Sequence, residues 1–369
     1  MQHKIVISDR DFTVKEELQD MAQNLSWDYN RIGGCGFFSF DLPIDYCTDR
    51  FLGGNFNVKI YTRGSDGTYS LRYQGKVENK NYSVRSGSEL VSVRGNGYQS
   101  ELNDILVSET YSSQEASVIV KDILDTYVTP NTNISYDAGD ISATSFTFDT
   151  LEFNADSVNS CIQKIADTVG NREWGVDKDR KLFFKQRSSS IGFRYPLGKN
   201  VISYGLDIDF KSIINRVTVV GGEISGTSFT RTVEDLKSQV KWNRRDRLFD
   251  NSSVTTNAVA DQLGASIIEE FKESVYRGRL QIISDQMIES TVPIPLVEVV
   301  TARDKYGSRK YGTGLYNGVI DHQINRINYD INEEGTQTIS MSIGKLRPDI
   351  AESINQLKYQ LDQERSKTL

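Results

Sequence analysis

Apolar and polar residues alternate in short runs through the first third of the chain. Phe38, Phe40 and Leu42, for example, share one face of an extended segment, because successive side chains of a strand point to opposite sides. Turns rich in glycine, serine and aspartate separate these runs, as they do in β-hairpins. The pattern predicts an antiparallel barrel or sandwich over residues 1–107, with one short helix at residues 14–24.

A helical period replaces this alternation in the middle of the chain. An apolar stripe along residues 156–170 predicts an amphipathic helix. Ser112 and Glu115 match a capping box at the start of an earlier helix. Two short strands with an acidic turn between them follow the second helix. We therefore expect residues 108–208 to form an α/β subdomain.

The strongest strand pattern in the chain is SIINRVTVVGG, at residues 212–222. Its β-branched residues alternate, with Val217 and Val219 on one face, and the run ends at paired glycines. This pattern predicts one half-buried strand at a seam between two β units. The second unit would span residues 209–346 and contain one inserted helix at residues 256–272, where apolar residues recur every fourth position.

Residues 347–369 are predicted to form a C-terminal helix. Its apolar residues recur at steps of four, three and four: Ile350, Ile354, Leu357 and Leu361. This is the seam spacing of a coiled coil, but two heptads are too short to hold a free coiled coil together. These four side chains are our candidate partner-binding residues. They would pack either on the chain's own second β unit or on another protein, and the sequence leaves both alternatives open.

Composition restricts the classes of function. The net charge is −7 and the isoelectric point is near 5.2, which disfavours generic nucleic-acid binding. The odd number of cysteines (Cys35, Cys47 and Cys161) and their spacing favour a reduced compartment and no metal site. With only His3 and His322 as imidazoles, no histidine-rich metal site is expected. No apolar run has the length of a membrane span or a signal peptide. We expect neither a membrane span nor a cofactor.

Candidate catalytic groups lack the motifs that would support them. Asp177 and Asp179 fall in a predicted tight turn, where aspartate is favoured for local hydrogen bonds. His322 lies beside Asp321, but no Gly-x-Ser-x-Gly motif accompanies it. The glycines on both sides of Cys35 leave room for an exposed thiol, yet no basic neighbour would activate it. The sequence therefore predicts that this protein is not an enzyme.

Several segments, in order along the chain, resemble the phage tail hub family, the baseplate-hub and late-control proteins that also occur in bacterial injection systems. The segments are LSWDYNRIGGCGFFSFDLP (25–43), REWGVDKDRKLFFKQR (172–187), INRVTVVGG (214–222), GVIDHQINRINYD (318–330) and TQTISMSIG (336–344). Each segment alone is weak evidence. Their common order and spacing carry the resemblance, which covers most of the chain.

The resemblance implies two antiparallel β-barrels related to the tail-tube fold, with α/β subdomains between them. INRVTVVGG would lead into the second barrel. Family members assemble as trimers whose six barrels form a ring of pseudo-sixfold symmetry. One side of the ring docks onto the tail-tube or distal-tail ring, and the other side carries the tip, spike or fibre protein. The chain would then be a structural component of the virion tail, assembled in the host cytoplasm.

DNA would pass through such a ring without sequence-specific binding, and an acidic lumen would keep its phosphates from sticking. The alternative function is a carbohydrate- or receptor-binding module of the tail tip, in which some of the 18 tyrosines and 3 tryptophans would stack on sugar rings. An enzyme that acts on the cell wall ranks last, because no pair of carboxylates stands out for glycoside hydrolysis.

Overall fold

The computed structural model describes most of the chain, and strands far outnumber helices in it. The described residues are 2–44, 56–64, 66–85, 88–144, 146–169, 171–197, 201–224, 227–250, 257–283, 294–300 and 319–344. The fold is α+β and dominated by β-structure, as the sequence predicts. The predicted C-terminal helix and its four apolar residues, Ile350, Ile354, Leu357 and Leu361, lie outside the described residues.

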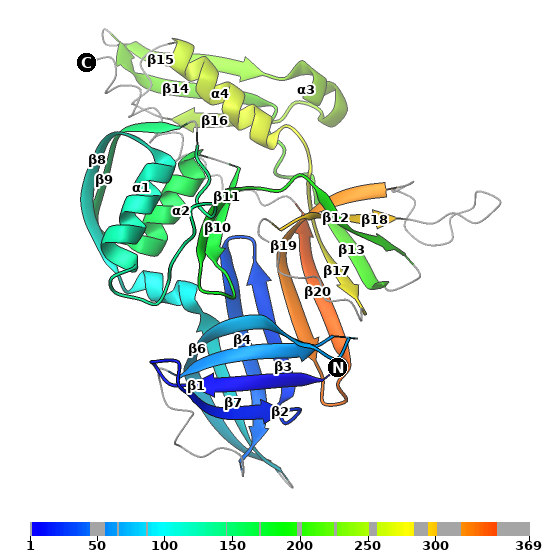
Figure 1. Ribbon diagram of the computed structural model, residues 1–369. Helices are drawn as coiled ribbons and strands as arrows, with labels where there is room; N and C mark the ends of the chain where they lie inside the picture. The colour runs from blue at the N-terminus through cyan, green and yellow to red at the C-terminus, as the bar shows by residue number, and fades with distance from the viewer. Residues whose placement is uncertain are drawn as a thin grey trace, which may run out of the picture.

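The first seven strands form one half of a large sheet (Figure 1). They are β1 (His3–Ser8), β2 (Val14–Gln19), β3 (Gln23–Asn30), β4 (Gly33–Pro43), β5 (Asn57–Arg63), β6 (Tyr69–Arg85) and β7 (Ser88–Gly97). Neighbouring strands pair antiparallel in the order β3-β4-β7-β6-β5-β1-β2. Phe38, Phe40 and Leu42 of β4 are fully buried in the core, which confirms the face that their alternation predicts.

The last strands of the chain continue the same sheet. They are β13 (Val201–Asp209), β17 (Val275–Ile282), β19 (Val319–Ile331) and β20 (Gln337–Gly344), joined by β12 (Ile191–Pro196) and β18 (Leu296–Val300). The order β13-β17-β20-β19 runs directly into β3, because β19 pairs antiparallel with β3. One hydrophobic core therefore contains residues from both ends of the chain, among them Ile5, Phe38, Ile327 and Met341.

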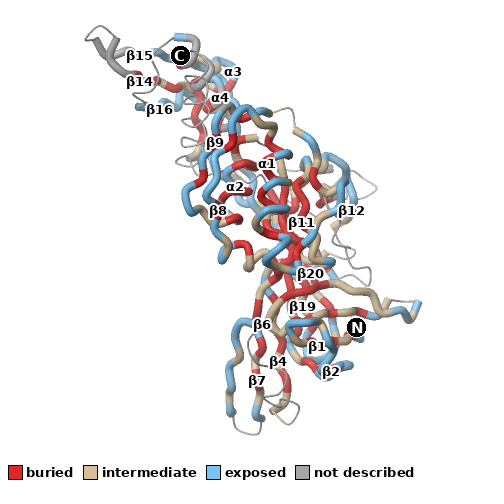
Figure 2. Tube along the Cα trace, turned by 60° about the vertical axis from the view of Figure 1, so that its left-hand side comes forward, coloured by how far each residue is buried: buried red, intermediate tan, exposed pale blue. Residues whose placement is uncertain are grey.

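An α/β unit lies beside the two halves of the sheet (Figure 1). Its elements are β8 (Leu106–Glu115), α1 (Ala116–Ile123), β9 (Thr147–Ser157), α2 (Val158–Val169), β10 (Arg172–Val176) and β11 (Leu182–Gln186). The stripe on α2 is buried, with Cys161, Ile162 and Ile165 fully covered. Figure 2 shows buried positions along the inner strands and exposed positions at the far end of the β6–β7 hairpin.

A second small unit lies at the opposite end of the molecule from β1–β7 (Figure 1). It consists of β14 (Arg216–Ile224), β15 (Thr227–Glu234), α3 (Leu236–Trp242), β16 (Asp246–Asp250) and α4 (Asn257–Phe271). Helix α4 packs on one face of the sheet β15-β14-β16, where Val217 and Val219 are fully buried. The strand predicted within residues 212–222 is confirmed, but it does not lead into the second half of the large sheet. Its partners are the neighbouring β15 and β16.

Two local predictions are wrong. Residues 14–24 contain the edge strand β2 and the start of β3 instead of a helix, because β2 pairs with β1 and buries only Leu18. Ser112 does not cap α1 but belongs to β8. The Glu115 side chain caps this helix instead, accepting hydrogen bonds from the backbone amides of Ser117 and Val118, as an N-cap carboxylate does.

Candidate functional site

The join between the two halves of the large sheet is built from two motifs of the resemblance, the one at residues 25–43 and the one at residues 318–330. Trp27 of β3 lies directly opposite Tyr329 of β19 in the antiparallel register. Their rings stack with centroids 5.2 Å apart and planes 10° from parallel. Both side chains are buried. Aromatic pairs in this geometry contribute beyond their buried area, so this contact helps to fix which strands meet at the join.

A buried carboxylate lies next to this aromatic pair. Asp28 is 1 % exposed and pairs with Arg326 of β19. It also accepts hydrogen bonds from the Asn30 side chain at 2.9 Å and from the backbone amide of Phe37 at 3.3 Å. Burial raises the pKa of Asp28 and Arg326 opposes that shift. Gly36 leaves the necessary room, since a Cβ there would lie 1.9 Å from the Asp28 Oδ1 atom.

An ion pair that is buried on both sides lies where both halves of the sheet meet the α/β unit. Arg31, in the turn between β3 and β4, donates from Nε to the backbone oxygen of Ile324 in β19 at 2.7 Å. The same Nε lies 3.8 Å from Oε2 of Glu173 in β10, and both side chains are 1 % exposed. Burial raises the pKa of Glu173 to about 7, while Arg31 and the backbone amide of Ile294 act to lower it. The pair is therefore costly to break by removing one partner.

Glycine permits backbone-to-backbone contact at this junction. β4 and β10 pair in parallel through Gly33 with Gly175 and Gly34 with Val176. A Cβ on Gly175 would lie 2.3 Å from the carbonyl carbon of Gly33, and a Cβ on Gly34 would lie 2.1 Å from the backbone oxygen of Val176. Gly34 also has a φ of +75°, a conformation that other residues rarely adopt. The Gly-Gly motif is therefore an attachment point for the α/β unit.

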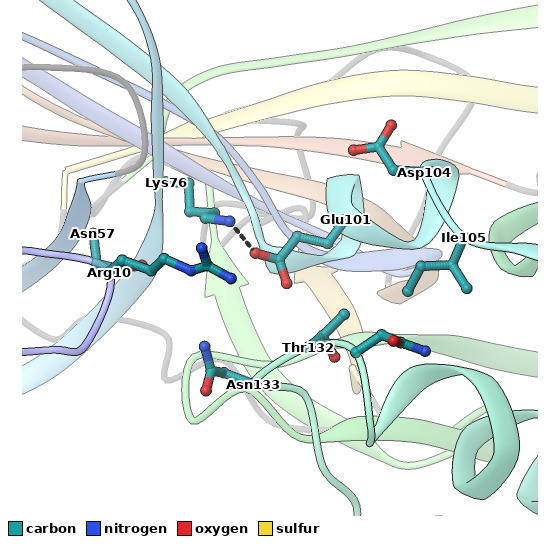
Figure 3. Close-up of a pocket in the computed structure, with 9 residues that line it drawn as sticks. Arg10, Asn57, Lys76, Glu101, Asp104, Ile105, Thr132 and Asn133 are labelled. Atoms are coloured by element: carbon teal, nitrogen blue, oxygen red, sulfur yellow. Dashed lines mark hydrogen bonds and ion pairs between the residues drawn. The ribbon is translucent and has the colours of Figure 1, made fainter.

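A polar cleft of about 210 Å³ lies on another side of the same boundary (Figure 3). Its lining residues are Arg10, Asn57, Lys76, Glu101, Asp104, Ile105, Asn131, Thr132 and Asn133. Lys76 and Glu101 form an ion pair within it, and the Arg10 guanidinium points towards them (Figure 3). Its lining has no aromatic ring on which a sugar would stack, so the cleft gives the carbohydrate-binding alternative no support.

The predicted turn at Asp177 and the histidine His322 both form hydrogen bonds within the fold. Asp177 accepts backbone hydrogen bonds from Asp179 at 2.8 Å and from Lys181 at 2.9 Å, so the Asp177–Asp179 turn is confirmed. The His322 ring nitrogen Nε2 lies 2.8 Å from the Tyr204 hydroxyl, and burial lowers the pKa of His322 to about 4. Both arrangements satisfy polar groups within the fold.

The two described cysteines are packing residues. Cys35 is 2 % exposed, so the prediction that its flanking glycines leave the thiol accessible is wrong. The adjacent strand β7 explains the burial, since a Cβ on its last residue, Gly97, would lie 2.1 Å from the Cys35 backbone oxygen. Burial raises the pKa of both thiols, that of Cys161 to about 12. Thiols of this kind are mostly protonated and poor nucleophiles at neutral pH.

The described residues hold neither a cluster of metal ligands nor a membrane-spanning helix. They contain no group of three or more histidine, cysteine, aspartate or glutamate side chains placed to hold a metal ion. No helix among them is long and apolar enough to cross a membrane. The aromatic stack, the buried ion pair and the glycine contacts of the described residues all lie at junctions between structural units. The sequence analysis missed Arg31 and Glu173, for which the one signal was a charged residue inside an apolar or glycine-rich strand motif.

The fold is similar to that of known tail proteins. The 43 kDa tail protein of prophage MuSo2 from Shewanella oneidensis matches 94 % of this chain and 99 % of its own, with a TM-score of 0.62 and 14 % identity. A tail protein from Neisseria meningitidis MC58 matches 93 % and 96 % of the two chains, with a TM-score of 0.64 and 12 % identity. The resemblance to tail hub proteins is thus confirmed for the fold.

A chain of the Francisella PdpA–VgrG complex aligns with 95 % of this chain over 59 % of its own length, with a TM-score of 0.59 and 13 % identity. No family model and no curated protein matches the sequence itself. The similarity to tail proteins therefore resides in the order and pairing of the elements, which the fold preserves at low sequence identity.

Proposed function

We propose that this protein is a structural tail hub. Three copies would form a ring of pseudo-sixfold symmetry, to which each copy contributes the two halves of its large sheet as two barrels. The ring would join the tail tube to the tip or spike and surround the path of the DNA. The predicted domains, residues 1–107, 108–208, 209–346 and 347–369, belong to this proposal.

The observation that carries the proposal is the end-to-end match with two tail proteins. More than nine-tenths of this chain and of each tail protein superimpose, so the likeness includes both halves of the sheet and the units between them. A match to one half alone would have fitted many unrelated β proteins. The contacts described above suit a structural component. They connect the early strand β3 to the late strand β19, and they connect the α/β unit to both.

The partners and the localisation follow from the same proposal. The PdpA–VgrG complex contains a chain with this fold, which supports a tip or spike protein as one partner. A tail-tube or distal-tail ring would be the other, and the protein would reside in the virion tail. The net charge of −7 suits a wall past which DNA must slide, because phosphates bind to positive surfaces. We propose no catalytic step for any residue.

Light scattering behind size exclusion tests the proposal. A trimer would weigh 3 × 41.7 = 125 kDa, and negative-stain images of that species should show a ring with an open centre. A species that stays at 41.7 kDa at high concentration and forms no ring would contradict the hub proposal. A glycan array on the same preparation tests the alternative, because specific and saturable binding would favour the receptor-binding module.

A further inference from the structure

The described chain leaves the second half of the large sheet at a fixed point. Gly344, the last residue of β20, pairs with Arg277 of β17. A Cβ on Gly344 would lie 2.1 Å from the backbone oxygen of Tyr276, so the two backbones are in direct contact. The Asn325 side chain holds the same spot through a hydrogen bond of 2.9 Å to the Gly344 oxygen. Whatever follows Gly344 must therefore start beside Tyr276.

Aromatic side chains are exposed at this exit point. Tyr276 is 41 % exposed and Phe210 is 45 % exposed. Ile208 lies opposite Tyr276 in the β13–β17 register, so these two side chains share one face, and Phe210 directly follows the end of β13. The Trp242 ring lies against Phe210, with centroids 5.3 Å apart. We call Phe210, Trp242 and Tyr276 the exit surface.

The exit surface continues the hydrophobic core. Leu280 and Ile282 follow Tyr276 on the same face of β17, and both are fully buried. Tyr204, Leu206 and Ile208 alternate along one face of β13, and Tyr204 and Leu206 pack against the same core. The described residues therefore cover this face in the middle of the sheet but leave it partly open at the end where the chain exits. An apolar strip that ends in exposed rings is suited to an apolar partner.

We propose that Ile350 and Ile354 of the same chain cover the exit surface. Ile350 follows Gly344 by six residues, which span at most about 20 Å when fully extended, so the first apolar residues of the C-terminal seam can reach Tyr276 and Phe210. Burial of two isoleucines and two rings would also stabilise a segment that is too short to be a stable helix alone.

The segment after Gly344 of the same chain is a better occupant of the exit surface than the same segment of a second copy, because it is covalently attached nearby. A short tether gives a local concentration on the order of millimolar, whereas a second copy would have to compete at its bulk concentration. The exit surface consists of three rings near one strand end, and a surface of this size suits one amphipathic turn better than a subunit interface. Leu357 and Leu361, further along the seam, remain available to another partner.

Trp242 provides the reporter for a test. The other two tryptophans, Trp27 and Trp174, are 2 % and 1 % exposed, so quenching of the folded protein by acrylamide reports mainly on Trp242. We expect a chain that ends at Gly344 and the variant Ile350→Glu/Ile354→Glu to show stronger quenching and emission at longer wavelength than the full chain. The off-seam variant Asn355→Glu/Gln356→Glu adds the same charges and should behave as the wild type.

A Trp242→Phe background separates docking from misfolding. There the two buried tryptophans report on the fold alone, and the truncation should leave their emission unchanged. Equal Trp242 quenching with and without the segment would overturn the proposal, as would a changed signal in the Trp242→Phe background. Protection that appears only at high protein concentration would place the segment on a second copy and overturn docking within one chain. None of these outcomes depends on the hub function, which the mass measurement tests separately.

Discussion

Trp27 stacks on Tyr329 across the antiparallel pair of β3 and β19, two strands that are far apart in the sequence and adjacent in the sheet. The α/β unit and the small unit are both inserted between these two strands in the sequence. The two halves of the large sheet are therefore joined only where β19 returns to pair with β3. This aromatic pair is one of the contacts that hold the two halves together.

Replacing Trp27 with alanine should lower the free energy of unfolding by about 3–5 kcal/mol, because it removes a fully packed aromatic side chain and leaves a cavity. Urea titration followed by circular dichroism measures the change. Val84→Ala is the matched control, since Val84 is 72 % exposed and its loss should cost within about 0.5 kcal/mol. A double-mutant cycle with Tyr329→Ala should return a coupling of about 0.5–1.5 kcal/mol. Additive effects would show that the stack itself contributes nothing.

Glu173 should make the protein less stable as the pH rises from 4.5 to 7. Its pKa is about 7 in the folded protein and 4.5 in an ordinary environment, so the folded state binds more protons in this interval and loses stability as they leave. The difference in unfolding free energy between the wild type and Glu173→Gln should fall by up to about 3 kcal/mol across it. Urea titrations at several pH values measure this difference. Parallel curves for the two proteins would contradict the prediction.

His322 should make the protein less stable as the pH falls, which is the opposite of the effect of Glu173. Burial lowers its pKa from 6.5 to about 4, so the unfolded chain binds a proton first as the pH falls. The stability it contributes is complete above pH 6.5 and is lost towards pH 4, by up to about 3 kcal/mol. His322→Gln keeps a neutral partner for the Tyr204 hydroxyl and should remove this acid sensitivity. Thermal melts between pH 4 and pH 7 provide the measurement, and an equally acid-sensitive variant would refute the assignment.

Gly175→Ala should destabilise the attachment of the α/β unit by about 1–3 kcal/mol, because its Cβ would meet the backbone of β4. Gly205→Ala is a suitable control, since a Cβ there meets no atom within 4 Å and should be neutral or stabilising by up to about 1 kcal/mol. Hydrogen exchange should locate the loss of protection in β4 and β10. Equal melting temperatures for the two variants would show that β4 and β10 tolerate separation.

The amphipathic patterns predicted a good part of the fold. Alternation placed Phe38 and Phe40 in the core, the helical stripe placed Cys161 on the buried side of α2, and turn chemistry located Asp177. These features depend on neighbours a few residues apart, so the sequence displays them directly. The helix predicted at residues 14–24 is wrong because a contact with another strand determines the structure there. Pairing with β1 makes β2 a strand and overrides the local helical preference of its residues.

Local patterns did not predict which residues would meet at the contacts between units. Arg31 and Glu173 look like ordinary polar residues in the sequence, and they become a buried pair only because β10 is placed against the β3–β4 turn. The strand pattern at residues 212–222 is as clear as any other in the chain, yet it did not reveal that β14 belongs to a separate sheet. Strand partners are set by long-range packing, and the alternation in one strand is compatible with many partners.

By itself, the sequence determined the β-dominated class, the amphipathic helices and the ordered motifs that resemble tail hub proteins. Each of these features depends on composition or on the spacing of residues close together in the sequence. Only the tertiary structure decided that β3 meets β19, that Trp27 stacks on Tyr329 and that Arg31 and Glu173 are buried together. The physical reason is that burial and register belong to pairs of distant segments. Contacts between distant segments stabilise the protein only when the whole core has formed.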